Sequence, residues 1–503
     1  MSNNPQISLV RGLGLVAAIS IIISNVIGTG VFLKARVMTC NVGSPNYVIL
    51  VWIAAGILSL AGALTYAELA AMMPQAGGTY NFLRKAYGNM ASFLFGWMQI
   101  FIAKAGSQAA VAVAFAIFLN DLAGKKLGLT LLKAQIPFFE IQMEWPIQFP
   151  FFTFSPTILD YELTTLQMIA VGLIVAVTVL NCASVSFSGS IATILTFVKI
   201  ALILLVGLGA FLLADGAFGN FAGSVGSGTC EGVAANVSYN SADYTLLAGF
   251  AAAMLGALWG YDGWDNLTYV AGEVKNPSRN IPIALVGGTA LIIVLYVFVN
   301  AAYFYVLPPE AVASVSKESS VAREVAARFF GASAITLMAF GLMASSFGTL
   351  HTSVLTGARI PYAMAQDGMF FKSLSKISPK TRVPVRALLA QGVWACILAL
   401  SGSFDTLTDY VIFGSWIFYA LATSSIFVFR IKYPEMERPY KAFGYPVVPV
   451  LFLLVATWLL VTTLVNSPLQ SLRGIILILI GLPFYFYFMR QNADTNGKLK
   501  MDN

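Results

Sequence analysis

Long apolar stretches recur along the whole chain, separated by shorter segments that carry most of the charged residues. An α-helix needs about 20 consecutive apolar residues to cross the hydrocarbon core of a bilayer. An open sheet exposed to lipid is excluded, because its unpaired backbone groups would find no partners there. We therefore expect an all-α integral membrane protein with twelve transmembrane helices. Their approximate bounds are Leu13–Phe32, Tyr47–Ala71, Ala91–Leu119, Leu163–Val185, Ile191–Ala214, Tyr244–Val270, Ile281–Leu307, Ala332–Gly357, Val383–Leu400, Leu407–Val428, Val447–Val465 and Ile475–Met489.

The composition agrees with lipid as the solvent of this chain. Of its 503 residues, 58% are hydrophobic and 10% are charged, whereas soluble domains are about a quarter charged. The basic residues behind the net charge of +7 are dispersed among the apolar spans, so no nucleic-acid partner is expected. The first span is long and lacks the pattern of a cleaved signal peptide, and we expect it to be retained.

The lysines and arginines favour one orientation in the membrane. With the N-terminus inside, the inner segments hold eighteen of them and the outer segments nine, while Lys104 and Lys199 fall within spans. Cytoplasmic loops carry such an excess, so both termini are expected in the cytoplasm. The expected cytoplasmic segments are residues 1–12, 429–446 and 490–503, and the expected long outer loops are residues 120–162 and 215–243.

The outer segments carry further expectations. The loop 120–162 is rich in aromatic residues and proline and is expected to pack on the outer face, and "PPEAVASVSKESSVAREVAARFFG" is expected to form an amphipathic helix at the outer surface. Cys40 and Cys230 fall on the same side, where a disulfide is possible, although unpaired thiols are the favoured expectation. The four scattered cysteines and the single histidine, His351, do not indicate a metal site, and no cofactor is expected.

Two spans are interrupted by glycines and polar residues. The first is "IIISNVIGTGVFLK", where Gly28 and Gly30 flank Thr29. Glycines in membrane helices often serve close packing alone, so this stretch has a structural and a functional interpretation. The second is "LWGYDGWDNLTYVAGE", which places Asp262 and Asp265 in an apolar run. Because each carboxylate at membrane depth costs at least ~2.5 kcal/mol, the pair of interruptions favours the functional interpretation.

The positions of the interruptions support a binding site. They fall in spans one and six, which correspond if the first ten spans form two inverted repeats of five, and paired interruptions of this kind indicate a transporter's central site. A broken helix exposes amide groups at a positive half-helix end, which attract a carboxylate. It also exposes carbonyl groups that accept hydrogen bonds from an ammonium group. A site offering both suits a zwitterion, and an amino acid is the plainest candidate.

Several motifs resemble one family. The stretches "SNVIGTGVF", "ELAAMMPQAGGTYNFLRKAYG", "SQAAVAVAFAIFL", "LNCASVS", "FVKIALI", "YDGWDNLTYVAGEVKNPSRNIPIA", "ARIPYAMAQDGMFF" and "RIKYPEMERPYKAFGYPVVPVLFLL" occur in family order and cover nearly the whole chain. The chain resembles bacterial members of the L-type amino-acid transporter family of the amino acid–polyamine–organocation superfamily. The resemblance implies a leucine-transporter-type fold. Its parts would be a first inverted repeat over residues 13–214, a second over residues 244–428, discontinuous helices 1 and 6, and two further helices in residues 447–489.

The resemblance also implies roles for single residues. The substrate carboxylate would be held by Gly28, Thr29 and Gly30. The substrate amino group would be held by Val26, Ile27, Trp259, Gly260 and Asp262. Trp259 would also close over the substrate, and Ser345, Ser346, Phe347 and Ser415 would line the side-chain pocket, although packing through small residues explains the serines equally well. Asp262 replaces the glycine of animal members, and it contributes a carboxylate or only caps the broken helix.

Lys199 lies in the middle of the fifth span, roughly eight residues from the inner end. In the family, a lysine here occupies the region where sodium-coupled relatives bind a cation, and it would tie the fifth helix to carbonyl groups near Gly28. The resemblance therefore implies sodium-independent transport. Lys199 is either a permanent substitute for the cation in an exchanger or a group that loses its proton in a proton-coupled symporter.

The preferred function is sodium-independent exchange of neutral L-amino acids by alternating access. No catalytic constellation indicates an enzyme, and a channel or receptor role finds little support. Animal members bind a heavy-chain subunit through a cysteine in the loop after the third span, but residues 120–162 contain none. A stand-alone carrier in a prokaryotic inner membrane is therefore expected. Glu68 and Glu273 lie near inner helix ends, where gating or packing with inner arginines competes with substrate contact. The sequence leaves the oligomeric state and the roles of Lys104 and Asp265 open.

Overall fold

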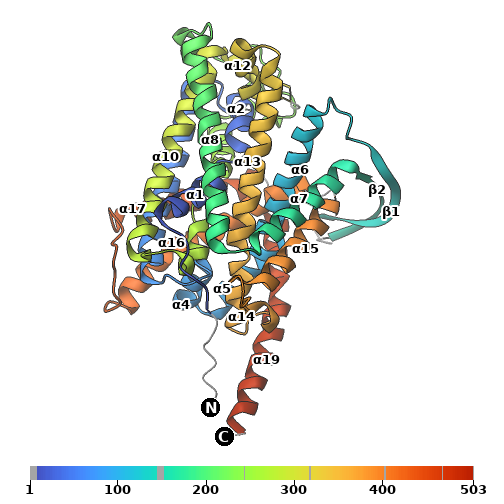
Figure 1. Ribbon diagram of the computed structural model, residues 1–503. Coiled ribbons are helices and arrows are strands. Elements are labelled where there is room, and N and C mark those ends of the chain that lie inside the picture. Colours follow the sequence, from blue (N-terminus) through green and yellow to red (C-terminus); the bar gives the residue numbers. More distant parts are fainter. Residues whose placement is uncertain are drawn as a thin grey trace.

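The computed structural model describes residues 8–143, 152–242, 244–316, 319–401, 404–466 and 468–501 as a bundle of helices with one β-hairpin at its side (Figure 1). Its elements in chain order are α1 (Leu15–Val26), α2 (Gly30–Val42), α3 (Pro45–Met72), α4 (Thr79–Tyr87), α5 (Asn89–Met98), η1 (Gln99–Lys104), α6 (Ala105–Leu122), β1 (Thr130–Met143), β2 (Phe152–Thr164), α7 (Thr165–Asn181), α8 (Val185–Leu213), η2 (Phe218–Ala222), η3 (Ala235–Val237), α9 (Leu246–Tyr261), η4 (Asn266–Glu273), α10 (Pro277–Val306), α11 (Pro309–Ala313), α12 (Val321–Phe330), α13 (Ser333–Gly357), α14 (Arg359–Gln366), η5 (Lys372–Ser375), α15 (Val385–Ser401), α16 (Phe404–Lys432), α17 (Val447–Asn466), α18 (Pro468–Leu479) and α19 (Gly481–Met501).

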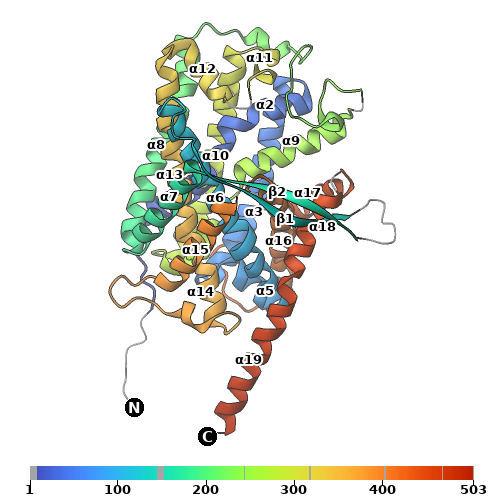
Figure 2. The ribbon, with the colours of Figure 1, turned by 90° about the vertical axis from the view of Figure 1, so that its right-hand side faces the viewer.

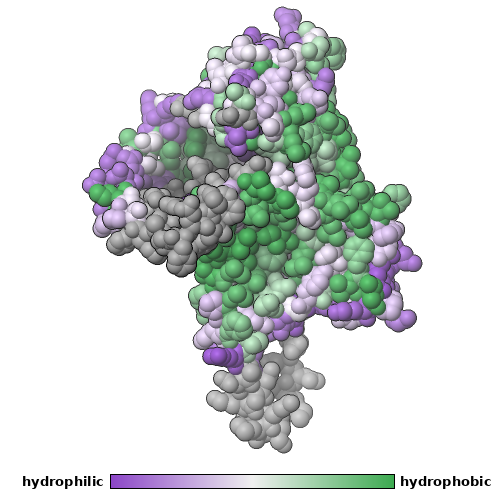
Figure 3. Space-filling model, turned by 180° about the vertical axis from the view of Figure 1, so that it is seen from behind, coloured by the Kyte–Doolittle hydropathy of each residue, from purple (hydrophilic) through white to green (hydrophobic). Residues whose placement is uncertain are grey.

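The helices match the lengths that a membrane requires. Among the described residues, nine helices are long and apolar enough to span a bilayer, or ten if α1 and α2, bent by 41° at their break, count as one span. Two shorter apolar helices, α7 and α15, lie where the fourth and ninth spans are expected. Hydrophobic side chains gather over the middle of the face of the bundle that is shown in Figure 3. Phe197 and Val294 are 63% and 64% exposed, and such a belt is typical of a surface that faces lipid.

The two expected breaks meet inside the bundle. α1 ends at Val26 and α2 begins at Gly30, while α9 ends at Tyr261 and η4 begins at Asn266. A Cβ atom on Gly30 would lie 3.1 Å from the Cα atom of Gly260, so the two chains approach at glycines. Gly263 has a φ of +100°, a conformation that a residue with a side chain rarely adopts.

A β-hairpin corrects the expectation of an all-α protein. β1 and β2 pair antiparallel from Thr130 opposite Thr164 to Met143 opposite Phe152, and both strands are rich in the β-branched and aromatic residues that favour sheets. The hairpin lies beside the helices rather than among them (Figures 1 and 2). Tyr161 donates a hydrogen bond to the carbonyl of Leu400 at the end of α15 (2.9 Å). Paired strands therefore replace much of the loop expected over residues 120–162.

The segment after α10 corrects a second expectation. It forms two short helices, α11 and α12, instead of one amphipathic helix. α12 begins afresh because the Ser320 side chain accepts a hydrogen bond from the amide of Arg323 (3.2 Å), and serine is a favoured residue at a helix start.

A disulfide joins Cys40, near the end of α2, to Cys230, so the expectation of unpaired thiols is wrong. The loop that contains Cys230 folds back over the end of α2. The amide of Tyr239 donates to the carbonyl of Cys40 (2.8 Å), and the amide of Val225 donates to the carbonyl of Gly43 (2.9 Å). Sequence position alone did not indicate that this loop packs on α2.

Removing the disulfide should lower the stability of the protein without changing its fold. Because it links residues 190 positions apart, the double variant Cys40→Ser/Cys230→Ser should lose about 2–4 kcal/mol of unfolding free energy. Thermal unfolding of the purified protein, with and without reductant, measures the change. The matched control is Cys182→Ala/Cys396→Ala, which removes the two free thiols and should leave the response to reductant intact. An unchanged melting temperature in the Cys40/Cys230 variant would contradict this prediction.

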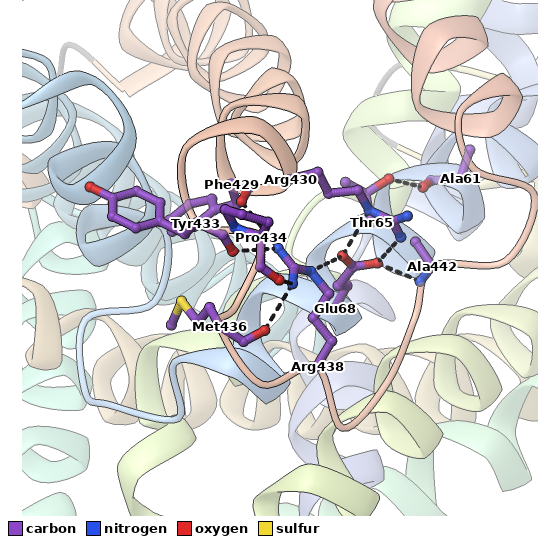
Figure 4. Close-up of polar contacts among 10 residues, drawn as sticks. All are labelled: Ala61, Thr65, Glu68, Phe429, Arg430, Tyr433, Pro434, Met436, Arg438 and Ala442. Atoms are coloured by element: carbon purple, nitrogen blue, oxygen red, sulfur yellow. Dashed lines mark hydrogen bonds and ion pairs between the residues drawn. The ribbon is translucent and has the colours of Figure 1, made fainter.

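The Glu68 carboxylate, near the end of α3, holds the loop between α16 and α17 (Figure 4). It accepts hydrogen bonds from Arg430 at 3.1 and 2.7 Å and from the amide of Ala442 at 2.6 Å. Arg438 lies 3.5 Å from the same carboxylate and donates to four backbone carbonyls at the end of α16 and in the following loop. Glu68 therefore packs with arginines, one of the two roles that its position indicates.

Glu273 forms a second buried ion pair. Arg359 of α14 donates from Nε and Nη2 to its two carboxylate oxygens at 2.7 and 2.9 Å, and both side chains are 0% exposed. The carbonyl of Glu273 accepts the amide of Leu13 (2.9 Å), and Leu13 forms a β-bridge with Val274. The pair thus joins η4, α14 and the start of α1. α14, which begins at Arg359, lies on the terminal side of the molecule, defined as the side where the first described residues and the end of α19 also lie (Figure 1).

Candidate substrate site

The first break exposes backbone groups at two helix ends. The Gly28 amide donates to the Val26 carbonyl (2.8 Å), which closes a tight turn after α1. α2 then starts at Gly30, and Thr29 makes no capping hydrogen bond through its side chain. The first amide groups of a helix have no partner within the helix and carry a partial positive charge. The turn at Gly28, Thr29 and Gly30 is therefore suited to an anionic group.

Tyr296 of α10 joins the two breaks. Its hydroxyl group lies 2.9 Å from the carbonyl oxygen of Val26 and 2.9 Å from that of Gly260, and its side chain is buried. Sequence reasoning missed Tyr296, because a tyrosine in an apolar span gives no signal of the carbonyl groups that it will meet.

A cavity of about 100 Å³ lies between the breaks. Eight of the residues assigned to the site from the sequence line it: Val26, Gly28, Thr29, Gly30, Trp259, Gly260, Asp262 and Ser415. The cavity is also lined by residues that sequence reasoning did not place there, including Asn25, Gln99, Lys104, Ser107, Asn266, Thr349, Ser353, Trp416 and Tyr419. We call it the central cavity.

Lys199 contacts the first break but does not line the central cavity. Its ammonium nitrogen is 2.6 Å from the carbonyl oxygens of both Ser24 and Ile27 and 2.8 Å from the hydroxyl oxygen of Thr349. The side chain is 1% exposed. α8 is thereby tied to the end of α1 and to α13, the kind of link to the first helix that the family resemblance implies.

Three residues assigned to the side-chain pocket also lie outside that lining. The Ser345 hydroxyl lies 3.2 Å from the carbonyl oxygen of Ile27 and 3.3 Å from that of Gly28, so it contacts the back of the break. Phe347 stacks on His351 with ring centroids 6.5 Å apart. The Ser346 hydroxyl is buried and has no hydrogen-bond partner among the described residues.

A charged cluster forms the wall of the central cavity near η4. The exposed carboxylate of Asp262 accepts a hydrogen bond from Tyr419 (2.7 Å), whose hydroxyl also lies 3.4 Å from the buried Asp265. Lys104, the last residue of the π-helical segment η1, donates to Asn266 (2.6 Å). Short π-helical segments within α-helices occur frequently at functional sites. Lys104 and Asp265 could be noticed in the sequence because each places a charge within an apolar span. Asn266 and Tyr419 are uncharged, and nothing in the sequence marked them as site residues.

Comparison with known proteins identifies the family. A sequence model of the family described as "Amino acid permease" matches residues 13–484. The chain belongs to the amino acid permease family. This permease is 29% identical over 486 residues to the b(0,+)-type amino acid transporter 1 of Rattus norvegicus, covering 96% of this chain and 88% of the relative. It is 28% identical over 487 residues to the serine/threonine exchanger SteT of Bacillus subtilis (strain 168), covering 96% and 98%. It is 28% identical over 485 residues to the cystine/glutamate transporter of Homo sapiens, covering 96% and 86%.

The family confirms the identification made from the motifs: the permease is an amino-acid transporter of the amino acid–polyamine–organocation superfamily. The apolar helices and the family together make it a multi-pass membrane protein. The relatives named above are transporters and exchangers rather than enzymes.

Proposed function

We propose that this permease exchanges neutral L-amino acids by alternating access and does not require sodium. The observation that carries the proposal is the position of the Lys199 ammonium group, 2.6 Å from the carbonyl oxygens of Ser24 and Ile27 at the first break. The family resemblance implies that sodium-coupled relatives bind a cation in this region. A permanent positive charge that already satisfies the carbonyl groups takes the place of a bound cation.

The substrate's charged groups have partners at the two breaks. The carboxylate binds the amides of Thr29 and Gly30 in the turn that begins at Gly28, where the start of α2 contributes its positive end, while the Gly28 amide holds the turn by donating to the Val26 carbonyl (2.8 Å). The amino group binds carbonyl oxygens at Val26, Trp259 and Gly260 and the carboxylate of Asp262. The remaining candidate, Ile27, does not line the central cavity, and its carbonyl oxygen faces Lys199 and Ser345, so its share in binding the amine is minor.

The walls of the central cavity support a neutral substrate. Ala103, Ala110, Val111 and Leu258 line it as well as the polar residues. Near η4 it presents both a carboxylate, Asp262, and an ammonium group, Lys104. A cavity with apolar walls and charges of both signs favours a zwitterion with an uncharged side chain over a substrate with a net charge.

The proposal includes the topology that the family resemblance implies. The nine long helices, the bent pair α1–α2 and the shorter α7 and α15 correspond one for one to the twelve expected spans. Residues 13–214 and 244–428 form the inverted repeats, and the two breaks occupy matching helices. Both termini lie in the cytoplasm of a prokaryotic cell, so the terminal side is the inner side. Because the segment 120–162 has no cysteine, the carrier works without a covalently attached subunit.

A proton-coupled symporter is the second candidate. The observation that favours it is the environment of Lys199, whose three hydrogen-bond partners are uncharged oxygen atoms. Loss and regain of a proton there would loosen and restore the contact between α8 and α1 in each cycle.

Counterflow in proteoliposomes tests the proposed function. Vesicles loaded with an unlabelled neutral amino acid should take up the same labelled amino acid. Replacing sodium by choline or imposing a pH gradient should leave the initial rate unchanged. Vesicles without internal amino acid are the control and should show little uptake. Uptake that needs sodium would contradict the proposal. Uptake that needs a proton gradient, but no internal amino acid, would select the symporter.

A further inference from the structure

Lys34 contacts the aromatic ring that covers the central cavity. Its ammonium nitrogen lies 4.8 Å from the ring centroid of Trp259. Lys34 follows Gly30 by four residues on α2, and residues with this spacing share one face of a helix. A Cβ atom on Gly30 would lie 3.2 Å from Cζ3 of the same ring. The indole of Trp259 therefore rests on α2 at Gly30 and carries a cation at Lys34.

Trp259 lines the central cavity and also two larger ones. The first, which we call the vestibule, measures about 640 Å³ and is lined by residues of α2, α6, α12 and α13 together with Trp259. The second, which we call the side cavity, measures about 440 Å³ and is lined by Lys34, Trp259 and residues of α2, α9, α16 and α17. Since Trp259 borders all three spaces, movement of its ring would join the central cavity to its neighbours.

We propose that Lys34 is a positioning residue for the lid formed by Trp259. Its ammonium group holds the indole over the central cavity by a cation–π contact and so lowers the fraction of molecules in which the lid is open. The expected effect on amino-acid exchange rests on the proposed function. The claim that Lys34 holds the Trp259 ring over the central cavity does not.

The strength of the contact sets the size of the expected effect. A partly desolvated cation–π contact contributes about 0.5–2 kcal/mol, and Lys34 is partly buried. Because each 1.4 kcal/mol is a factor of ten, loss of the charge should raise the open fraction by roughly two- to thirtyfold. Lys34→Met keeps an apolar chain of similar length and removes the charge, whereas Lys34→Arg keeps the charge and should preserve the closed lid.

Thiol labelling tests the lid directly. Ser353 lines the central cavity and is 5% exposed, and Ser353→Cys in a background with Cys182→Ala and Cys396→Ala provides a buried reporter in that cavity. A membrane-impermeant maleimide is applied from the vestibule side of sealed vesicles. Lys34→Met should speed labelling roughly two- to thirtyfold, and Lys34→Arg should leave the rate near that of the parent. Lys126→Met, the same change at an exposed lysine of the α6–β1 segment, is the matched control and should have no effect.

A double-mutant cycle with Trp259→Leu separates the lid from any other contact of Lys34. In that background Lys34→Met should cause no further increase in labelling, because the ring on which the charge acts is absent. An equal increase in both backgrounds, or no increase with Trp259 present, would overturn the inference. If Lys34→Met accumulates poorly, Lys34→Gln at matched protein amounts gives the same comparison.

Counterflow gives the second readout. With Trp259 present, Lys34→Met should raise the KM for external amino acid several-fold and leave the maximal exchange rate within about twofold, because an open lid weakens retention of substrate. A parent protein that labels as expected but exchanges no amino acid would refute the proposed function without contradicting the role of Lys34 in holding Trp259. A parent protein that exchanges, combined with unchanged labelling and KM in Lys34→Met, would refute the role of Lys34 alone.

Discussion

Replacing Lys199 by alanine should reduce amino-acid exchange by at least about 100-fold while the protein still folds. The ammonium group makes hydrogen bonds to Ser24, Ile27 and Thr349, and each hydrogen bond from a charged group contributes about 1.5–3 kcal/mol. Loss of even two such bonds exceeds the 2.8 kcal/mol or so that corresponds to a hundredfold change. The carbonyl groups at the end of α1 would then lose the contact that fixes the first break. Initial rates of counterflow at matched protein amounts measure the effect.

Thr196, which lies on α8 as Lys199 does, provides the control for the Lys199→Ala experiment. Thr196 of α8 donates a single hydrogen bond to the carbonyl of Ser20 on α1 (2.9 Å), so Thr196→Val removes a contact between the same helices without removing a charge. This variant should retain exchange within about threefold, because one neutral hydrogen bond contributes about 1 kcal/mol or less. Full exchange by Lys199→Ala, or an equal loss in both variants, would show that the charge at the break has no special role.

The breaks and the membrane spans could be predicted because they follow from local sequence. Runs of apolar residues determine the spans, and the glycines beside Thr29 and Asp262 mark the ends of helices before any tertiary contact is known. The β-hairpin was missed because the aromatic and proline-rich composition of residues 130–164 is equally typical of a loop. The cross-strand pairs of side chains that stabilise a hairpin can be recognised only when the two strands are aligned with each other. The disulfide was missed because it depends on how a long loop folds back over α2.

The contacts among the polar residues of the central cavity could not be predicted from the sequence. Lys104 and Asp265 could be noticed because a charge in an apolar span is costly, but their partners lie far away in the chain. Tyr419 reaches Asp262 from a position 157 residues later, and Lys104 reaches Asn266 across 162 residues. Position along the helix decided the remaining cases. Thr349 lines the central cavity, whereas Ser345, one turn earlier on the same helix, does not, although the hydroxyl groups of both lie near the carbonyl oxygen of Ile27.

Breaking the ion pair between Glu273 and Arg359 should strongly destabilise the protein. Both side chains are 0% exposed, and two hydrogen bonds of 2.7 and 2.9 Å join them. Arg359→Met would leave the Glu273 carboxylate buried without its partner, which costs about 3–5 kcal/mol. We expect a marked drop in the melting temperature of the purified protein and in its abundance in membranes. The more exposed pair formed by Arg84 and Asp367, with side chains 42% and 20% exposed, is the control, and Arg84→Met should cost less than about 1 kcal/mol.

The double variant Glu273→Met/Arg359→Met distinguishes loss of the pair from loss of packing. Removing both charges also removes the cost of burying them, and replacing a buried ion pair by apolar side chains is often neutral. The double variant should therefore be more stable than Arg359→Met, although it has one more substitution. A double variant at least as unstable as the single one would show that the shapes of the two side chains, rather than their charges, hold η4 against α14. Recovery of the fold without recovery of exchange would mean that the pair stabilises one of the states through which the transporter alternates.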